Sequence, residues 1–520
     1  SSSRVTMIAK TFSATVLGID AHLIEVEVDV TVGMSVFNIV GLPDGTIKES
    51  RDRVLSAVNN SGFSFPVRRV VVNLAPAPLR KIGSGFDLPI ALALLGTMGL
   101  FPPENLKRAM VVGELSLDGE IRPVRGILPV AVATRDHKLE QLILPKANEA
   151  EAAVVEGISI VPVSTLSQVV QYLKGDLEIT AVDYEPQSLF SQEQFHEEDF
   201  QDVKGQEHVK RALEVAAAGS HNLLMLGPPG SGKTMLARRM STILPPLSFD
   251  EALECTKIHS IAGLIPSGTA LISARPFRFP HHTISQAGLV GGGSIPGPGE
   301  ISLSHNGVLF LDEFPEFPRA TLELLRQPLE DGSLTISRAA MSLEFPCKFM
   351  LLASMNPCPC GYHGAPTGQG ENRRECNCPP QQIQKYRAKI SGPLLDRIDI
   401  HLTVPAVEYE KLAEARQGES SKNIRERVVR SRQIQQERFQ NSSTRNNSGM
   451  TRKELEKHAQ LADASRKMLE QAMTKMGLSA RAYDRILKVA RTIADLAEQE
   501  NIDTLHVAEA IQYRNLDRPL

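Results

Sequence analysis

The sequence lacks any hydrophobic run long enough to cross a membrane. A membrane-spanning helix needs about 18 to 20 consecutive apolar residues, and no such stretch occurs in this chain of 520 residues, of which 22% are charged. No secretory signal precedes the first expected strand. We therefore expect a cytoplasmic protein that makes no membrane contact.

Cysteine and excess positive charge are also scarce. Six cysteines in 520 residues are too few for the disulfide frameworks of small secreted proteins. The formal net charge is −3, so the molecule is not a polycation and any nucleic-acid contact must come from a local patch. With 42% hydrophobic residues the composition is that of a globular protein, and the length predicts roughly two to four domains.

The most informative pattern in the chain is a phosphate-binding loop. Its residues fit the pattern G-x-x-x-x-G-K-[ST] and are Gly227, Pro228, Pro229, Gly230, Ser231, Gly232, Lys233 and Thr234. The apolar run 222–226 predicts a buried strand before the loop, and 234–240 predicts a helix after it. In this setting backbone N–H groups point at phosphate oxygens. We expect Lys233 to contact the β- and γ-phosphates of ATP and the Thr234 hydroxyl to hold Mg²⁺.

A second nucleotide signature lies about eighty residues further on. Residues 307–311 predict a buried strand that ends in Asp312 and Glu313. A carboxylate at the carboxyl end of a parallel strand lies beside the phosphate loop. The pattern predicts that Asp312 holds the Mg²⁺ shell and that Glu313 polarises the attacking water. An acidic N-cap of the next helix is the alternative interpretation of this pair.

The segment 275–313 carries a family resemblance. It contains R-P-F-R-F-P-H-H-T-I-S at 275–285, G-L-V-G-G-G at 288–293 and P-G-E-I-S at 298–302. With the phosphate loop, it resembles the magnesium-chelatase-related AAA+ ATPases of the ComM (YifB) family, over nearly the whole chain. The resemblance implies a hexameric, ring-forming ATP-driven DNA helicase that promotes branch migration during homologous recombination in natural transformation. It implies ATP and Mg²⁺ as cofactors, and single-stranded and branched DNA as partners.

The resemblance assigns roles to two residues that follow the nucleotide signatures. Asn356 ends a third buried strand, 349–355, and fits the sensor position that orients the water or the γ-phosphate. A turn-forming Asn-Pro pair is the alternative. Arg397 matches the arginine finger that completes a neighbour's site in a ring and stabilises transition-state charge. Its alternative is an ion pair within the chain, with Asp396 or Asp399.

Two further arginines have expected roles. Ser479 is expected to cap a helix that places Arg481 in its first turn, at the position of the second sensor of AAA+ lids. An ordinary surface arginine is the alternative. Residues 334–345 read as two strands with a turn near Arg338, where related helicases point a basic residue into the central pore. We therefore expect Arg338 to contact a DNA phosphate, against the alternative of an exposed turn arginine.

The first third of the chain resembles another family. Residues 80–91, 119–128 and 143–149 resemble the proteolytic domain of Lon-type proteases, whose mechanism needs a serine nucleophile and a lysine base. Gly85 stands at the serine position and Leu128 at the lysine position. Both departures remove the chemistry, so we expect a scaffold for assembly or a nucleic-acid contact surface instead of a peptidase.

Four of the cysteines form two close pairs around a loop rich in Gly, Pro, Asn and Arg. They are Cys358, Cys360, Cys376 and Cys378. Four cysteines in two pairs suit a tetrahedral Zn²⁺ site, although C-x-C is tighter than the usual spacing. A loop this poor in apolar residues needs a bound metal ion or another cross-link to hold its shape. Free thiols and a disulfide are the alternatives, and a reducing cytoplasm disfavours the disulfide.

These features predict a multidomain α/β protein in four parts. A Lon-like α/β domain, catalytically degenerate, covers 7–185 and an acidic linker covers 186–202. An AAA+ core with a parallel sheet, an insertion loop, a hairpin and the cysteine loop covers 203–405. A helical lid covers 406–520 and includes a basic helix, 424–439, that we expect to be solvated or to face DNA.

Overall fold

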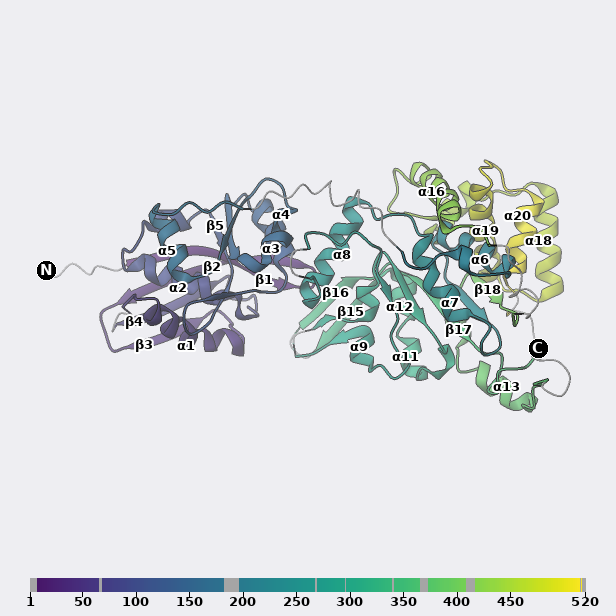
Figure 1. The fold of residues 1–520 in the computed structure, drawn as a ribbon, viewed down its shortest axis with the longest axis horizontal. Helices are drawn as coiled ribbons and strands as arrows, with labels where there is room; N and C mark the ends of the chain where they lie inside the picture. The colour runs from purple at the N-terminus through teal and green to yellow at the C-terminus, as the bar shows by residue number, and fades with distance from the viewer. Residues whose placement is uncertain are drawn as a thin grey trace.

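The fold is elongated, with two sheets and a helical end. We describe a computed structural model of residues 7–64, 68–181, 196–266, 269–294, 296–338, 341–364, 373–407, 417–514 and 516. Figure 1 shows the chain running along the long axis, from an N-terminal sheet through a central sheet to helices at the C-terminal end. Within the described residues, no helix combines the length and the apolar character that a membrane crossing requires.

The N-terminal part is built on a mixed seven-stranded sheet with the order β3-β4-β2-β1-β5-β8-β9. Its first two strands form a long antiparallel pair, because alternating apolar residues give both strands one buried face. The strands are β1 (Met7–Leu17), β2 (Asp20–Thr31), β3 (Val36–Val40), β4 (Arg69–Ala75), β5 (Ala109–Val111), β8 (Gln141–Pro145) and β9 (Ser159–Val163), and a side hairpin pairs β6 (Glu114–Leu115) with β7 (Ile121–Arg122).

Helices cover this sheet. The central one, α2, is apolar on all sides and is buried along its whole length, against β1 and β2. The α-helices are α1 (Gly45–Asn60), α2 (Asp87–Thr97), α3 (Ile127–Asp136), α4 (Glu149–Ala153) and α5 (Leu166–Lys174). Short 3₁₀ turns are η1 (Ser84–Phe86), η2 (Pro103–Leu106) and η3 (Lys146–Asn148). Leu128, the residue that the Lon resemblance places at the lysine position, is fully buried in α3.

The central part is built on a five-stranded sheet in which every neighbouring pair is parallel. The strand order is β11-β14-β17-β10-β18. The strands are β11 (Phe277–Arg278), β14 (Val308–Leu311), β17 (Met350–Met355), β10 (Leu223–Leu226) and β18 (Ile400–Thr403). Because all five strands run the same way, their carboxyl ends meet at one edge of the sheet and their amino ends at the other.

Helices and two hairpins surround the central sheet. The helices are η5 (Phe200–Asp202), α6 (Glu207–Gly219), α7 (Lys233–Arg238), η6 (Arg239–Thr242), α8 (Phe249–Ala262), α9 (Gln286–Val290), α10 (Glu300–Leu303), η7 (Phe314–Glu316), α11 (Arg319–Glu323), α12 (Arg326–Asp331), α13 (Pro380–Arg387) and α14 (Gly392–Leu395). The hairpin β15 (Ser333–Arg338) with β16 (Met341–Pro346) confirms the predicted pair of strands.

The glycine-rich insertion at 288–299, expected to be a loop, contains short regular elements. It folds as α9 followed by a small hairpin of β12 (Gly291–Gly292) and β13 (Gly297–Pro298). Leu289 is fully buried in the apolar cluster of the central sheet. One well-placed leucine therefore gives the insertion an anchor that its many glycines cannot supply.

The C-terminal helices pack onto one face of the central sheet through α6. A single apolar cluster joins sheet residues such as Phe310 to lid residues such as Ile486 and Ile493. The helices are α16 (Ser421–Arg438), η9 (Asn447–Gly449), α17 (Arg452–His458), α18 (Asp463–Met476), α19 (Ala480–Leu496) and α20 (Thr504–Gln512). The described part of the predicted lid is helical, and the Ser479 hydroxyl caps α19 as expected.

Two arginines of the basic helix α16 differ from the expectation that they are solvated or face DNA, whereas Arg430, 50% exposed, agrees with it. Arg432 donates to the carbonyl oxygens of Ala217 and Ala218 at the end of α6, and Arg438 pairs with the buried Asp495 of α19. Arg432 and Arg438 donate to α6 and α19 because the unpaired carbonyls at a helix end and a buried carboxylate need hydrogen-bond donors.

Helix α8 touches both other parts of the molecule. At its C-terminal end the Ser260 hydroxyl donates to Glu151 (2.8 Å) and the Ser260 carbonyl accepts from the Gly126 backbone (3.2 Å). At its middle, Glu254 pairs with Arg445 from the C-terminal part (2.9 Å). Most of the predicted linker, residues 186–195, lies outside the described residues.

Candidate nucleotide site

The predicted nucleotide residues meet at the carboxyl edge of the central sheet. The phosphate loop follows β10 directly, Asp312 follows β14, and Asn356 follows β17. Gly230 and Gly232 have φ values of 75° and 87°, a left-handed conformation that favours glycine. They turn the loop so that α7 begins at Lys233, and the start of a helix is where unpaired N–H groups can bind phosphate.

Lys233 lies inside the loop, surrounded by oxygen acceptors. Its Nζ donates to the carbonyls of Gly227 (2.8 Å) and Pro228 (2.9 Å) and lies 3.3 Å from Oδ1 of Asn356. Burial lowers the pKa of Lys233 to about 8, while the charge of Asp312 acts in the opposite direction. The ammonium is therefore poised inside the loop, where a phosphate oxygen would replace the backbone carbonyls as its acceptor.

Thr234 and Asp312 contact each other as the Mg²⁺ prediction requires. The Thr234 hydroxyl donates to Oδ2 of Asp312 (2.9 Å), and the Ser354 hydroxyl of β17 donates to Oδ1. Hydroxyl and carboxylate oxygens are the ligands that Mg²⁺ prefers. An oxygen of helix α7 and an oxygen of the residue after β14 thus lie together beside the phosphate loop.

Glu313 is turned away from its neighbour Asp312. Its backbone is left-handed, with φ 52°, and its Oε2 lies 3.3 Å from Nδ1 of His282. Glu313 occupies the N-cap position of η7 without a side-chain capping bond. The Asp312 carboxylate accepts from the Glu313 N–H. Neither side chain therefore caps η7, and the alternative interpretation as an acidic helix cap does not describe them.

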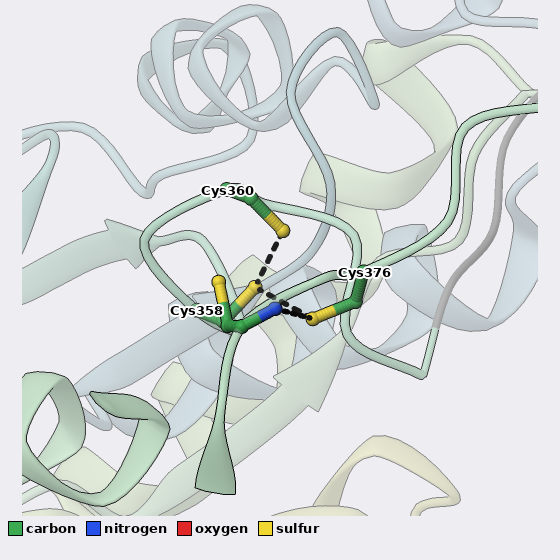
Figure 2. A group of neighbouring side chains, drawn as sticks. Cys358, Cys360 and Cys376 are labelled. Atoms are coloured by element: carbon green, nitrogen blue, oxygen red, sulfur yellow. Dashed lines mark hydrogen bonds between the residues drawn. The ribbon is translucent and has the colours of Figure 1, made fainter. Parts of the chain in front are cut away.

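The cysteine loop lies directly beside the phosphate loop. Sγ of Cys358 is 3.3 Å from that of Cys360 and 3.7 Å from that of Cys376, and the four Sγ atoms, with Cys378, lie within 4.8 Å of one another. Figure 2 shows the three labelled side chains turned toward a common centre. All six cysteines of the chain are free, so this cluster could hold a metal ion.

Arg397 lies at the opposite edge of the sheet from the phosphate loop. It precedes β18, and Asn222, which precedes β10, donates to its carbonyl oxygen (3.2 Å). Its guanidinium donates to the Glu330 carboxylate and to the Pro393 carbonyl (2.6 Å). The alternative of an ion pair with Asp396 or Asp399 therefore does not describe this structure. The residue has a different acidic partner, on α12.

Arg481 lies at the same edge as Arg397. It donates to Oδ2 of Asp396 (3.2 Å), and its side chain is 68% exposed. About 13 Å of strand separates this edge from the phosphate loop, since β10 has four residues at roughly 3.3 Å each. Within one chain, the structure brings neither arginine to the phosphate loop.

Arg338 ends β15 opposite Met341, at the tip of the hairpin. Its side chain and the turn residues 339 and 340 lie outside the part of the chain that the structure describes. Its expected contact with DNA therefore stays a prediction.

Three polar residues of the site were not predicted from the sequence. Ser354 supports Asp312, His282 contacts Glu313, and Gln206 donates from Nε2 to the Ser231 carbonyl of the phosphate loop (3.0 Å). Ser354 carried a signal, because a serine near the carboxyl end of an otherwise apolar buried strand needs a polar partner. The contacts of the other two depend on tertiary folding.

Comparison with known proteins places this geometry in a family. Residues 199–412 match the model described as magnesium chelatase, subunit ChlI. Residues 26–148 match the subunit ChlI of Mg-chelatase model, and residues 418–514 match the model of the ChlI C-terminal part. The chain is also 31% identical over 159 residues to Lon protease 2 of Bacillus subtilis, covering 28% of this chain and 27% of that protein.

Two similar proteins align along almost their whole length. Competence protein ComM of Haemophilus influenzae is 44% identical over 517 residues, which cover 99% of this chain and 98% of that protein. The YifB protein of Escherichia coli is 42% identical over 506 residues, or 97% of this chain and 96% of its own length. The chain belongs to the ComM/YifB family of magnesium-chelatase-related AAA+ proteins.

Proposed function

We propose that this protein is an ATP-driven, ring-forming DNA helicase that promotes branch migration during homologous recombination in natural transformation. The observation that carries the proposal is the position of the residues. The loop 227–234 and Asp312 lie together at one edge of the central sheet, and two arginines, Arg397 and Arg481, lie at the other. A ring of identical chains brings opposite edges of neighbours together. The name of the similar protein ComM supports a role in competence.

The residues at the carboxyl edge fit ATP with Mg²⁺. The loop 227–234 would bind the phosphates, with Lys233 on the β- and γ-phosphates. Thr234 and Asp312, already in contact, would hold Mg²⁺, which neutralises charge on the transferred phosphoryl group. Glu313 would polarise the attacking water, and Asn356 would orient it. His282 would hold the Glu313 carboxylate until the site closes.

The two arginines would act on the site of a neighbouring chain. Arg397 would release Glu330 and stabilise transition-state charge as an arginine finger. Arg481, which is more exposed, would sense the γ-phosphate from the same side. This assignment accounts for the distance of both residues from their own phosphate loop, and it favours a closed ring, which we expect to be hexameric.

We propose a scaffold role for the N-terminal part and a structural role for the cysteines. Residues 7–185 would form a Lon-like domain without peptidase chemistry, because Leu128 offers no base. Residues 186–202 would be a linker, 203–405 the ATPase core and 406–520 the lid. Cys358, Cys360, Cys376 and Cys378 would hold one structural Zn²⁺. A DNA substrate would be met in the cytoplasm, where we expect this activity.

The test is ATP hydrolysis with and without single-stranded and branched DNA, together with migration of a branched junction. We expect DNA to stimulate hydrolysis and the junction to move. Lys233→Ala should abolish hydrolysis, since one phosphate-site charge is worth about a hundredfold or more in rate. Arg338→Ala should hydrolyse ATP without the DNA response, because the hairpin tip is the proposed DNA contact.

Two results would contradict parts of this proposal. ATP hydrolysis without any DNA response or junction movement would reject the DNA motor while keeping the nucleotide site. A full DNA response in Arg338→Ala would reject the hairpin tip as the DNA contact. Arg319→Ala, on α11 of the same core, serves as a control for the loss of a positive charge elsewhere.

A further inference from the structure

The backbone of the cysteine loop, at Gly361, packs against a side chain of the phosphate loop, that of Pro229. Gly361 lies one residue after Cys360, and a Cβ at this glycine would meet Cδ of Pro229 at 2.6 Å and Cγ at 2.7 Å. Such distances are well inside van der Waals contact. The phosphate loop therefore rests on a backbone surface that only glycine can offer.

The same segment is joined to the nucleotide site through Asn356. Cys358 follows Asn356 by two residues, and Asn356 Oδ1 lies 3.3 Å from Nζ of Lys233. The Gly361 N–H donates to Sγ of Cys358 (3.2 Å) and to its carbonyl oxygen (3.0 Å). The first cysteine pair thus lies between two contacts with the phosphate site, one on each side.

The second cysteine pair closes the loop at its base. Cys376 and Cys378 lead into α13, whose Arg387 donates from Nε to the carbonyl of Pro357 (3.1 Å). Residues 365–372, at the far end of the loop, lie outside the described residues. The loop leaves and rejoins the core beside the phosphate site. A link between the two cysteine pairs would therefore also hold the backbone beside Asn356 and Gly361 in place.

The sulfur positions favour one metal ion over the other ways of joining the pairs. Sγ of Cys358 lies 3.3 Å from Sγ of Cys360 and 3.7 Å from Sγ of Cys376. Both distances are far longer than a disulfide bond of about 2.05 Å. A tetrahedral Zn²⁺ with Zn–S bonds of about 2.3 Å separates its sulfurs by about 3.8 Å. Four thiols alone would be joined only by weak S–H contacts.

We propose that Zn²⁺ at the four cysteines holds Gly361 against Pro229 and thereby sets the affinity of the phosphate loop for ATP. This inference rests on the proposed nucleotide and zinc sites. Zinc binding restricts the conformations of the cysteine loop before ATP arrives. The phosphate loop then binds in a preformed shape, which lowers the entropic cost of binding.

The first experiment compares the full-length protein with and without zinc. Bound metal is measured by mass spectrometry, and ATP affinity by titration with a fluorescent ATP analogue and Mg²⁺. We expect one zinc per chain. Removal by a thiol-reactive reagent and a chelator, followed by thiol reduction, should weaken ATP binding by roughly tenfold, and added Zn²⁺ should restore it.

A pair of glycine variants separates docking from metal binding. Gly361→Ala inserts a methyl group into the Pro229 contact. Gly364→Ala, in the same loop, has a similar left-handed backbone, with φ +70° against +94°, but meets nothing within 4 Å. We expect both variants to keep zinc and only Gly361→Ala to lose ATP affinity, again by roughly tenfold.

The outcomes distinguish this inference from the proposed function. Unchanged ATP affinity after zinc removal, or in a zinc-loaded Gly361→Ala, overturns the coupling. Absence of zinc, or iron in its place, overturns the metal assignment. If the zinc-loaded wild type does not bind ATP at all, the proposed nucleotide site itself is rejected. Where zinc removal unfolds the chain, as circular dichroism would show, the glycine pair alone decides.

Discussion

Lys233 is surrounded by neutral acceptors. Its nearest oxygens belong to the carbonyls of Gly227 and Pro228 and to the amide of Asn356, and burial lowers its pKa from 10.5 to about 8. Between these two values the folded chain binds fewer protons at Lys233 than the unfolded chain. The contribution of this group to folding stability therefore rises with pH through that window.

This pKa predicts a proton taken up with ATP. Bound phosphates favour the charged ammonium, so at about pH 9, above the pKa of about 8, ATP binding should be accompanied by uptake of up to about one proton. At about pH 7, where the ammonium is already charged, uptake at this group should be close to zero. Calorimetric titration in two buffers of different ionisation enthalpy measures the uptake. Equal uptake at both pH values would contradict the prediction.

Residues with a fixed local spacing were predictable from the sequence, and residues that depend on folding were not. The phosphate loop and Asp312 follow from short patterns next to buried strands, and the structure brings them together. The partner of Arg397 is Glu330, 67 residues away, and Ser354 reaches Asp312 across 42 residues. No local pattern encodes such pairs, because they exist only after the strands have been ordered.

At the scale of helices and strands, periodicity predicted the lid better than the N-terminal part. The lid helices alternate buried and exposed residues clearly. Helix α8 was missed although Ser248 and Glu251 form a capping box at its start. Strand β1 was also missed. The arginines of α16 were expected to be solvated or to face DNA, since the partners of Arg432 and Arg438 lie on other helices, α6 and α19, and cannot be seen in the local sequence.

One buried carboxylate holds the lid helices together. Asp495 of α19 is 1% exposed and accepts from Arg438 of α16 at 2.7 and 2.6 Å. It also accepts from Arg491 at 3.2 Å and from Asn447 at 2.8 Å. Removing its charge leaves two arginines without their anion, which is costly because they are largely buried.

We therefore predict that Asp495→Asn destabilises the lid by about 3–5 kcal/mol. Hydrogen exchange of the α19 amides should become faster by about a hundredfold or more. The control is Glu456→Ala, which removes a pair with Arg452 whose side chains are 71% and 88% exposed; it should change stability by less than about 0.5 kcal/mol. Exchange in Asp495→Asn as slow as in the wild type would show that the pair is not needed.

At the scale of the whole molecule, the residues of the proposed ATPase site lie at two edges of one sheet. Arg397 lies beside the amino ends of the strands, and the phosphate loop lies at their carboxyl ends. In this structure a single chain does not bring the two together, whereas the head-to-tail ring that we propose would join them at every junction.

Mixing two inactive variants tests this division. Lys233→Ala lacks a working phosphate loop and Arg397→Ala lacks the finger, so each alone should hydrolyse little ATP. In a one-to-one mixture, about a quarter of the junctions combine an intact loop with an intact arginine. We expect the mixture to recover up to about a quarter of wild-type hydrolysis. No recovery in a mixture that still assembles, as light scattering would show, would place Arg397 outside the neighbour's site.

Helix α8 is in contact with both ends of the molecule. Arg445 of the lid holds it at Glu254, and the N-terminal part holds it at Ser260. The two points lie about 9 Å apart along a helix that barely stretches. A lid that pivoted during the proposed ATP cycle would therefore push or pull the N-terminal part at α4, which carries Glu151, and at Gly126, where α3 begins. Movement at the proposed nucleotide site would then reach the far end of the molecule through direct contacts, whatever the length of the segment that joins the two sheets.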